Sequence, residues 1–481
     1  MNLLNRPPEV LSSEEMTRIW QAGLEIFARV PVRIQGDDEV FDALNDLGCV
    51  IEGDRVTFPE PVRDAVLERI EAHRDGRGPG RPAKVSNADL VYLASGQAIY
   101  YTDHRTDEIR PATSEDQALF SRVCDCFPGL GRSHPTLIPQ DVPAPTCDLH
   151  SLALVVKNSS RPWRIAAFGA RMIPYMIEVL KAAGHSHEQI AQSDWINTTC
   201  YYTSPLCIAA DALEIGMTAR RLLGRPLQVS SMPVIGMSAP VTISGAMAYM
   251  VAECLGANAL TLAVDGRLNG WSISPVSFDM RAGTHSCSGP DTHLLRIAAA
   301  QMSAYIFGGE YTVGTAPLTS AVRPGLQSGL EKGMGAMFAI MSGARTWGAL
   351  ALTGTTDVGS ISQLLIDLEI VGYVQHMLRG VQVDERRIGV DTIVETAPRG
   401  AYFLETPQTA EFFREELWIP ELMDRRAPMA WAQDPSDMVE RARTKTQQVI
   451  ASAENRSPLD ASQRQKIDEI LADADRAVAR E

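Results

Sequence analysis

Residues 228–258 read QVSSMPVIGMSAPVTISGAMAYMVAECLGAN, and this stretch decides the fold class. A short apolar strand is expected over 227–232. It is followed by a turn rich in Gly, Ser and Pro and by an uninterrupted apolar helix over 242–255, whose start carries Pro240, Thr242 and Ser244 as capping signals. A second strand is expected over 259–264. A strand, a short loop, a buried helix and another strand form a parallel β/α unit.

The same alternation extends along most of the chain, which predicts the α/β class and a (β/α)8 TIM barrel. Strands are expected at 135–138, 163–168, 196–201, 227–232, 259–264, 311–315, 346–352 and 388–394. Helices are expected between them at 149–157, 170–183, 207–223, 242–255, 293–307, 324–341 and 361–378, with a closing helix at 409–417. A doubly wound open sheet is the alternative. No Gly-x-Gly-x-x-Gly follows any of these strands, which removes the usual dinucleotide reason for that alternative.

Three regions are expected along the chain. Residues 1–130 form an N-terminal cap of helices and a β-hairpin, residues 131–435 the barrel, and residues 436–481 a charged helical tail. The segment 265–290 shows no regular pattern and is expected to be a long functional loop.

Composition restricts the class of protein. The chain has 481 residues, 45% of them hydrophobic, and a formal net charge of −15, which argues against nucleic-acid or anionic-membrane partners. Its eight cysteines are scattered without a CxxC pair, so a disulfide framework is not expected. The N-terminus lacks the apolar core of a signal peptide. We therefore expect a cytoplasmic protein, and a chain of this size with a charged helical tail is expected to form a homo-oligomer.

Side chains at the predicted strand ends are rich in aromatics and poor in acids and bases. This composition does not suit a general acid/base hydrolase. It suits a box of π-faces around a quaternary ammonium, where each face contributes roughly 0.5–2 kcal/mol. No residue is predicted to act as a catalytic acid, base or nucleophile, only to position the substrate. The candidate substrate-binding residues are Gln97, Tyr100, His134, Asn197, Tyr201, Tyr202, Asn269, Trp271, His285, Tyr311 and Trp347.

Core packing is the alternative role for every one of these aromatics. Two other groups of residues are weaker signals. His285, Cys287 and His293 match no standard zinc spacing, so no bound metal is expected. Glu331 and Lys332 are interpreted as an exposed ion pair on a helix.

An ordered series of motifs covers most of the chain and resembles the trimethylamine methyltransferase family. The motifs are Tyr100-Tyr-Thr-Asp103 with Glu108-Ile-Arg-Pro-Ala-Thr-Ser-Glu-Asp116, Tyr202-Thr-Ser-Pro-Leu206, the Met232–Glu253 segment, Gln327–Lys332, Gln363–Glu369, and Arg399–Leu404 with Thr406–Thr409. The resemblance implies a barrel enzyme that moves a methyl group from a methylated amine to the cobalt of a corrinoid (cobalamin) held by a separate partner protein.

Two departures from the family pattern sharpen this expectation. Archaeal members carry pyrrolysine near the position where this chain reads Ala316-Pro-Leu-Thr-Ser320, and no special residue stands here. The resemblance is therefore to the glycine betaine:corrinoid methyltransferases, whose quaternary amine substrate needs no activation. Its carboxylate would need donors, for which Asn269, His285, Gln97 and the backbone amides after Gly266 or Gly314 are candidates. Gln408 stands where the family commonly has histidine, so no role is carried over to it.

Two other functions are compatible with the same barrel. A non-catalytic betaine-binding protein would bind betaine without transferring a methyl group. A metal-dependent lyase or hydrolase would contain stoichiometric zinc.

Overall fold

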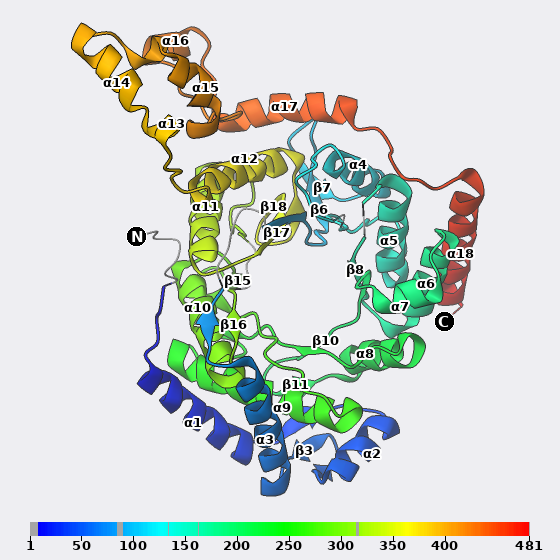
Figure 1. Ribbon diagram of the computed structural model, residues 1–481. Helices are drawn as coiled ribbons and strands as arrows, with labels where there is room; N and C mark the ends of the chain where they lie inside the picture. The colour runs from blue at the N-terminus through cyan, green and yellow to red at the C-terminus, as the bar shows by residue number, and fades with distance from the viewer. Residues whose placement is uncertain (1–7, 84–89, 133, 162, 314–316, 481) are drawn as a thin grey trace.

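The computed structural model describes residues 8–480 except 84–89, 133, 162 and 314–316. The chain is an α/β protein in which α4, α5, α8, α9, α10, α11 and α12 lie around a central region of short strands (Figure 1). The helices are α1 (Ser13–Arg29), α2 (Asp38–Leu47), α3 (Glu60–Arg77), α4 (Ser114–Cys124), α5 (Cys147–Asn158), α6 (Ile173–Ala182), α7 (His187–Gln192), α8 (Ala210–Leu223), α9 (Ile243–Asp265), α10 (Pro290–Phe307), α11 (Leu326–Met341), α12 (Ile361–Leu378), α13 (Glu385–Ile388), α14 (Val390–Thr396), α15 (Pro407–Glu416), α16 (Pro428–Gln433), α17 (Met438–Ser452) and α18 (Ala461–Ala479).

The strands are short, and most of those in the centre pair in parallel. They are β1 (Val32–Ile34), β2 (Val50–Glu52), β3 (Arg55–Thr57), β4 (Arg81–Pro82), β5 (Val91–Ala94), β6 (Tyr100–Thr102), β7 (Ile109–Pro111), β8 (Ile165–Ala166), β9 (Ile196–Asn197), β10 (Cys200–Tyr201), β11 (Cys207–Ile208), β12 (Val229–Ser230), β13 (Val234–Ile235), β14 (Val276–Asp279), β15 (Thr284–Ser286), β16 (Glu310–Tyr311), β17 (Thr346–Leu350), β18 (Leu352–Thr353) and β19 (Val358–Gly359).

The parallel pairs link strands that helices separate in the sequence. These pairs are β17 with β5, β8 with β9, β10 with β12, β13 with β14, and β16 with β4. Isolated parallel bridges join Tyr92 to Leu130, Ala98 to Leu137 and Ser231 to Ile273. Parallel strands need a crossover connection, and the helices supply it, which confirms the α/β class.

Most predicted helices are confirmed. α5, α6, α8, α10, α11 and α12 lie within a few residues of their expected bounds, and α15 corresponds to the closing helix. The predicted hairpin is present as β6 and β7, although β5, from the same region, pairs with β17 instead. Ser12 caps α1 and Thr113 caps α4, each through a capping box.

The predicted strand at 259–264 is wrong, because these residues continue α9 as far as Asp265. All sides of this helix between Ala246 and Leu262 are buried. A helix that is apolar all round shows no 3.6-residue periodicity, so its second half could not be distinguished from a buried strand. α9 is also long and apolar enough to cross a membrane, but 83% of its most apolar window is buried inside the protein, as in a core helix.

Two further predictions about secondary structure are wrong. The predicted strand at 388–394 forms α13 and α14, which Gly389 separates with a φ of +61°. The segment 265–290, predicted to be irregular, contains β14 and β15 as an antiparallel pair. β14 is therefore the strand that follows α9, displaced along the sequence from the expected position. The predicted strand 311–315 is described only in part, because 314 and 315 lie outside the described residues.

Candidate functional site

A polar cavity of about 330 Å³ lies on the inner side of five neighbouring strand segments. Strands β5, β8, β9 and β17 contribute to its wall, together with the segment around residue 134. Because side chains alternate along a strand, every second residue of these segments faces the same space. The cavity is lined by Leu93, Ser95, Gly96, Gln97, His134, Pro135, Arg164, Ala166, Asn197, Thr346 and Gly348.

Three nitrogen atoms of this lining are buried without a partner. Within the described part of the chain, Gln97 Nε2, His134 Nε2 and Arg164 Nε have no hydrogen bond. Arg164 Nε forms only a long ion pair, with Asp194 Oδ2 at 3.9 Å, and this carboxylate also pairs with Arg132. Nearly all buried polar groups in proteins are satisfied, and these three nitrogens around one cavity are donors available to a ligand with acceptor atoms.

The charge of the cavity is positive at neutral pH. Burial, together with the charges of Arg164 and Arg132, lowers the pKa of His134 to about 4, so its imidazole is neutral and the charge comes from Arg164. The residues that line the cavity include no Asp, Glu, Lys or Cys. A set of donors with one cation and no acid fits a carboxylate or another oxygen anion. It offers no pair for general acid/base chemistry.

The backbone on two sides of the cavity is strained. Gln97 has a φ of +60° and Ala349 a φ of +59°, both in the left-handed region that non-glycine residues rarely adopt. The Ala349 N–H donates to Ser95 Oγ at 3.2 Å, which joins the two strained segments. A Cβ at Gly96, whose φ is +153°, would lie 2.0 Å from Leu352 Cδ1. Strained positions of this kind cluster at ligand sites.

A buried ion pair lies next to the turn that follows β17, beside the strained backbone of the cavity. Lys332 Nζ lies 2.6 Å from Asp367 Oδ2, which also accepts the Ala351 N–H at 2.7 Å. Ala351 itself has a φ of +78°, so the carboxylate helps to hold the strained turn after β17. The prediction of an exposed Glu331–Lys332 pair is therefore wrong. Lys332 points inward to α12, and Glu331 accepts from Thr319.

The predicted site residues lie in several different parts of the structure. Gln97, His134 and Asn197 come together in the polar cavity. Trp271 and Tyr311 line a different cavity of about 380 Å³ beside α10. Tyr100 and Tyr201 are exposed on β6 and β10.

The other four predicted residues have partners within the protein. Trp347 is 1% exposed and packs edge-on against Tyr92 at 5.9 Å. Tyr202 is buried, and its hydroxyl donates to the Glu253 carbonyl at 3.1 Å. The Asn269 side chain accepts a hydrogen bond from the Val229 N–H and donates one to the Val229 C=O, both at 2.8 Å. His285 lies on β15 opposite Phe278.

The aromatic residues are thus not gathered in one cluster, and the aromatic box stays a prediction. Gly314, proposed above as a backbone donor, lies outside the described residues. Among the residues that the structure describes, no group of three or more His, Cys, Asp and Glu side chains could hold a metal ion. The expectation that no metal is bound remains a prediction.

Arg164 and Phe168 are functional candidates that sequence reasoning missed. Arg164 interrupts an otherwise apolar strand (Trp-Arg-Ile-Ala-Ala-Phe), and a charge in that position is a signal of a buried polar role. Phe168 is half exposed and lies two residues after the cavity residue Ala166, just beyond the end of β8. Tyr201 lies on β10, four residues after the cavity residue Asn197 of β9.

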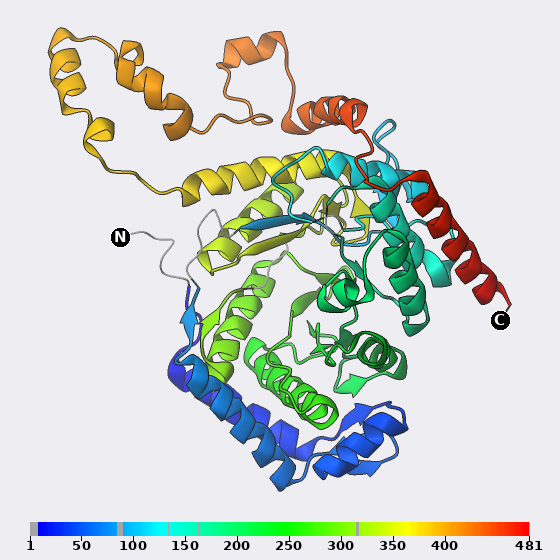
Figure 2. The ribbon, with the colours of Figure 1, turned by 45° about the vertical axis from the view of Figure 1, so that its right-hand side comes forward.

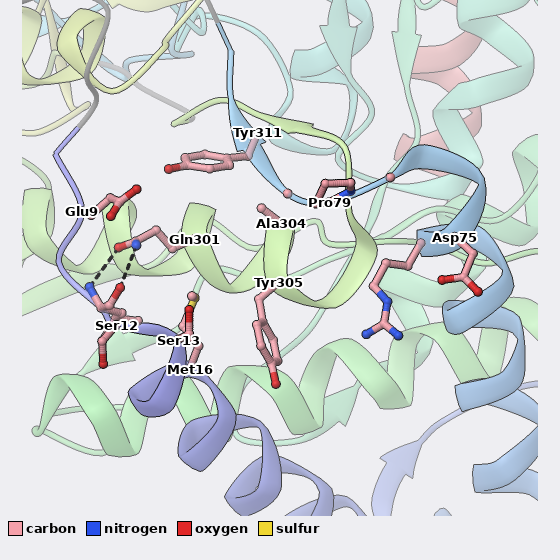
Figure 3. A pocket seen from close by; sticks show the side chains of 14 residues that line it. Glu9, Ser12, Ser13, Met16, Asp75, Pro79, Gln301, Ala304, Tyr305 and Tyr311 are labelled. Carbon is pink, nitrogen blue, oxygen red and sulfur yellow. Dashed lines mark hydrogen bonds between the residues drawn. The ribbon is translucent and has the colours of Figure 1, made fainter.

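A larger cavity of about 740 Å³ lies on the outside of the molecule, between α1, α10 and residues 78–80 (Figure 3). Gln301 Oε1 accepts from Val10 N at 2.8 Å and Leu11 N at 3.1 Å, and its Nε2 donates to the Leu11 carbonyl at 3.0 Å. This side chain uses both ends of its amide to fasten the N-terminal segment to α10. The cavity is therefore a structural junction, and the smaller polar cavity is the better site candidate.

Comparisons with known proteins agree over most of the chain. The family model described as trimethylamine methyltransferase (MTTB) matches residues 2–478. The glycine betaine methyltransferase of Desulfitobacterium hafniense (strain Y51) is 23% identical over 453 residues, covering 92% of each chain. The trimethylamine methyltransferase of Methanosarcina thermophila is 26% identical over 469 residues, covering 94% of each chain. The crystal structure of the Methanosarcina barkeri monomethylamine methyltransferase aligns with a TM-score of 0.46 at 12% identity, over 95% of this chain and 90% of that one.

Proposed function

Because the chain belongs to the trimethylamine methyltransferase family, we propose that this methyltransferase takes its methyl group from a quaternary amine carboxylate such as glycine betaine. The acceptor is the cobalt(I) of a corrinoid carried by a separate partner protein. The observation that carries the proposal is the set of three unsatisfied nitrogens around the polar cavity.

The donors of the cavity suit the carboxylate end of such a substrate. Arg164 supplies a positive charge and an N–H, and Gln97 supplies an amide N–H₂. His134 is neutral, so Nε2 can donate in one of its tautomers. Each of these groups has a buried nitrogen without a hydrogen bond, and a bound carboxylate would satisfy them together.

The quaternary nitrogen would then lie toward the exposed aromatic rings. Phe168 follows the cavity residue Ala166 just beyond the end of β8, and Tyr201 lies on β10, four residues after the cavity residue Asn197 of β9. A trimethylammonium group cannot be hydrogen-bonded, and π-faces attract it by roughly 0.5–2 kcal/mol each. The substrate would therefore present its methyl groups away from the donors, where a corrinoid can approach.

Methyl transfer from such a substrate needs no proton. The N–CH₃ bond breaks with its electron pair left on nitrogen, and a new Co–C bond forms as cobalt(I) is oxidised formally to cobalt(III). The leaving group is a neutral tertiary amine, which agrees with a cavity that offers no acid/base pair. The work of the protein is to align the N–CH₃ bond and to exclude water from the reaction.

The test is to incubate the purified protein with chemically reduced cobalamin and a panel of betaines and to follow methylcobalamin by its absorbance. Methylcobalamin is expected from at least one betaine. Betaine binding measured by calorimetry without any methyl transfer would instead support a non-catalytic binding barrel. Neither binding nor transfer with any betaine would contradict the proposal.

We also propose that the parallel strand pairs close into a (β/α)8 barrel. The support is the series of parallel contacts that runs from β17 through β5 and the segment 130–137, and again from β8 to β14. Closure requires three more pairings: segment 130–137 with β8, β14 with β16, and β16 with β17. An experimental structure in which these neighbours stay apart would contradict it.

The three-part organisation of the chain, the cytoplasmic location and the homo-oligomeric state are kept as proposals, but the proposed barrel takes β5 from the N-terminal region. All eight cysteines are free, which suits a reducing compartment. Extensive exposed apolar surface supports association between copies.

A further inference from the structure

The segment 380–435, here called the arm, projects from the end of α12 away from the rest of the molecule (Figures 1 and 2). It contains α13, α14, α15, α16 and two short 3-10 helices, and none of these six helices has a buried residue. Large apolar side chains are exposed along it, among them Val381, Val390, Val394, Tyr402, Leu404 and Met429.

The base of the arm is held firmly. Arg379 at the end of α12 donates to Glu416 Oε2 at 2.7 Å, at the end of α15. The Glu369 carboxylate on α12 accepts the backbone N–H groups of Leu422 and Met423 at 2.9 and 3.0 Å. The part of the arm between α12 and Met423 is therefore fixed to α12 at both of its ends, which keeps its direction constant.

An ordered segment with so little burial needs a surface to cover it. Ordering the backbone costs about 1–2 kcal/mol per residue, and apolar burial is the main term that offsets this cost. Within the arm, Arg387 contacts Asp384 and Glu415, both at 2.6 Å, but exposed ion pairs contribute little. The apolar side chains of the arm are therefore expected to pack against another surface.

The same chain exposes a second apolar surface on α11. Leu326, Leu330, Met334 and Phe338 are all exposed and follow each other at intervals of four residues, so they form one line along the helix, here called the α11 stripe. Leu326 is 92% exposed. Nothing lies within 4 Å of a Cβ built at Gly329 or Gly333 beside the stripe, so another backbone can approach closely there.

The face of α11 that carries the stripe is uncharged. The charged residues of this helix are Glu331 and Lys332, and both turn to partners within the chain. Glu331 accepts from Thr319 Oγ1 at 2.6 Å, and Lys332 is buried against Asp367. This neutral apolar face suits an apolar partner such as the arm.

We infer that the arm of one copy covers the α11 stripe of a second copy, and that the second copy does the same in return. A contact of this kind is made twice around a two-fold axis, as in most homodimers. The arm cannot cover the stripe of its own chain in this structure, because its fixed base directs it outward (Figure 2). The corrinoid carrier is a poor occupant, because it has to approach the cavity and α11 lies in the outer layer of helices (Figure 1).

The oligomeric state of the full chain tests the inference by sedimentation equilibrium. A dimer or a larger even oligomer is expected. L330R on the stripe and L404E on the arm are each expected to weaken self-association at least ~30-fold, since both place a charge at the centre of an apolar contact. M334E and V394E provide a second variant on each side. L222R, at an exposed leucine on α8, is the matched control and is expected to leave the mass unchanged.

Mixing the L330R and L404E variants distinguishes the reciprocal contact between arm and stripe from other modes of self-association. A dimer of one L330R chain and one L404E chain keeps one intact contact, between the normal arm and the normal stripe, so mixing is expected to restore association. If the arms packed on each other, L330R alone would leave association unchanged while L404E weakened it, and the inference would be overturned. A monomeric wild type, or association that neither variant changes, would overturn it as well. Circular dichroism of each variant checks that the fold is intact.

Discussion

Two buried polar clusters in the centre of the molecule differ in whether their buried polar atoms have hydrogen-bond partners. Glu253 on α9 is completely buried, and four donors satisfy its carboxylate: Ser204 Oγ at 2.7 Å, Leu206 N at 3.3 Å, and the hydroxyls of Ser231 and Tyr249. In the polar cavity, Gln97, His134 and Arg164 each keep a buried nitrogen without a partner among the described residues.

The difference separates a structural role from a binding role. A satisfied buried network holds the loop 204–206 and the strand end at 231 against α9, and its free energy contributes to folding. Unsatisfied donors lower the stability of the free protein, and a ligand with acceptor atoms would satisfy them on binding. Mutations in the first cluster should therefore affect unfolding, and mutations in the second should affect binding.

The largest effect is expected at Glu253. Glu253→Leu removes the acceptor of four donors and should lower the free energy of unfolding by about 3–5 kcal/mol, measured by urea denaturation. Glu253→Gln keeps one acceptor oxygen and should cost less. A loss below about 1 kcal/mol for Glu253→Leu would show that the network is not structural and would remove the contrast between the clusters.

The opposite result is expected at Gln97. Gln97→Leu removes an unsatisfied amide, so the free energy of unfolding should stay the same or rise slightly. The dissociation constant of the betaine substrate should increase about 10- to 100-fold, because one donor to the carboxylate is lost. Calorimetric titration measures it, and Gln21→Leu, at an exposed position on α1, is the matched control. Destabilisation comparable to that of Glu253→Leu would place Gln97 with the structural residues.

The bounds of helices that have one polar face or a clear boundary signal could be predicted from the sequence. α5, α8, α10, α11 and α12 were predicted within a few residues. α9 was predicted only to its middle, since burial on all sides removes the periodicity that identifies a helix. The apolar β-branched run at 388–394 predicted a strand, but Gly389 in a left-handed conformation ends α13 there, and the run remains exposed on the arm.

The candidate site was predicted only in part, because position along a strand does not reveal the direction of a side chain. Gln97, His134 and Asn197 were predicted at strand ends and share the cavity. Trp347 was predicted by the same rule, but it turns to the other side and packs against Tyr92. Arg164 was missed because it stands near the start of the predicted strand 163–168, while candidates were sought at strand ends. The burial of Lys332 could not be predicted either, since its partner Asp367 lies on another helix.

A smaller effect is expected from His134 in the dependence of stability on pH. The pKa of His134 in the folded protein is about 4, below its ordinary value of 6.5, so between these values the unfolded chain binds a proton that the folded chain does not. The free energy of unfolding should therefore fall as the pH decreases from 6.5 toward 4. His134→Asn should reduce this fall by about 1–2 kcal/mol, measured by urea denaturation at pH 7 and pH 4.5. An unchanged pH dependence in the variant would mean that His134 is not a buried neutral group.

The smallest effect is expected at the aromatic end of the site, where the substrate contact is exposed to water. Tyr201 is about half exposed, and its removal leaves no buried group unpaired, so Tyr201→Leu should not change stability. A cation–π contact at an exposed position contributes about 0.5–1 kcal/mol, so the dissociation constant for glycine betaine should rise roughly 2- to 5-fold. Tyr201→Phe keeps the π-face and should bind as the wild type does, whereas loss of a hydroxyl contact would affect both variants equally. If Leu and Phe weaken binding alike, or if neither does, the quaternary nitrogen does not lie against Tyr201, and the orientation proposed for the substrate must be reversed or shifted toward the cavity of Trp271 and Tyr311.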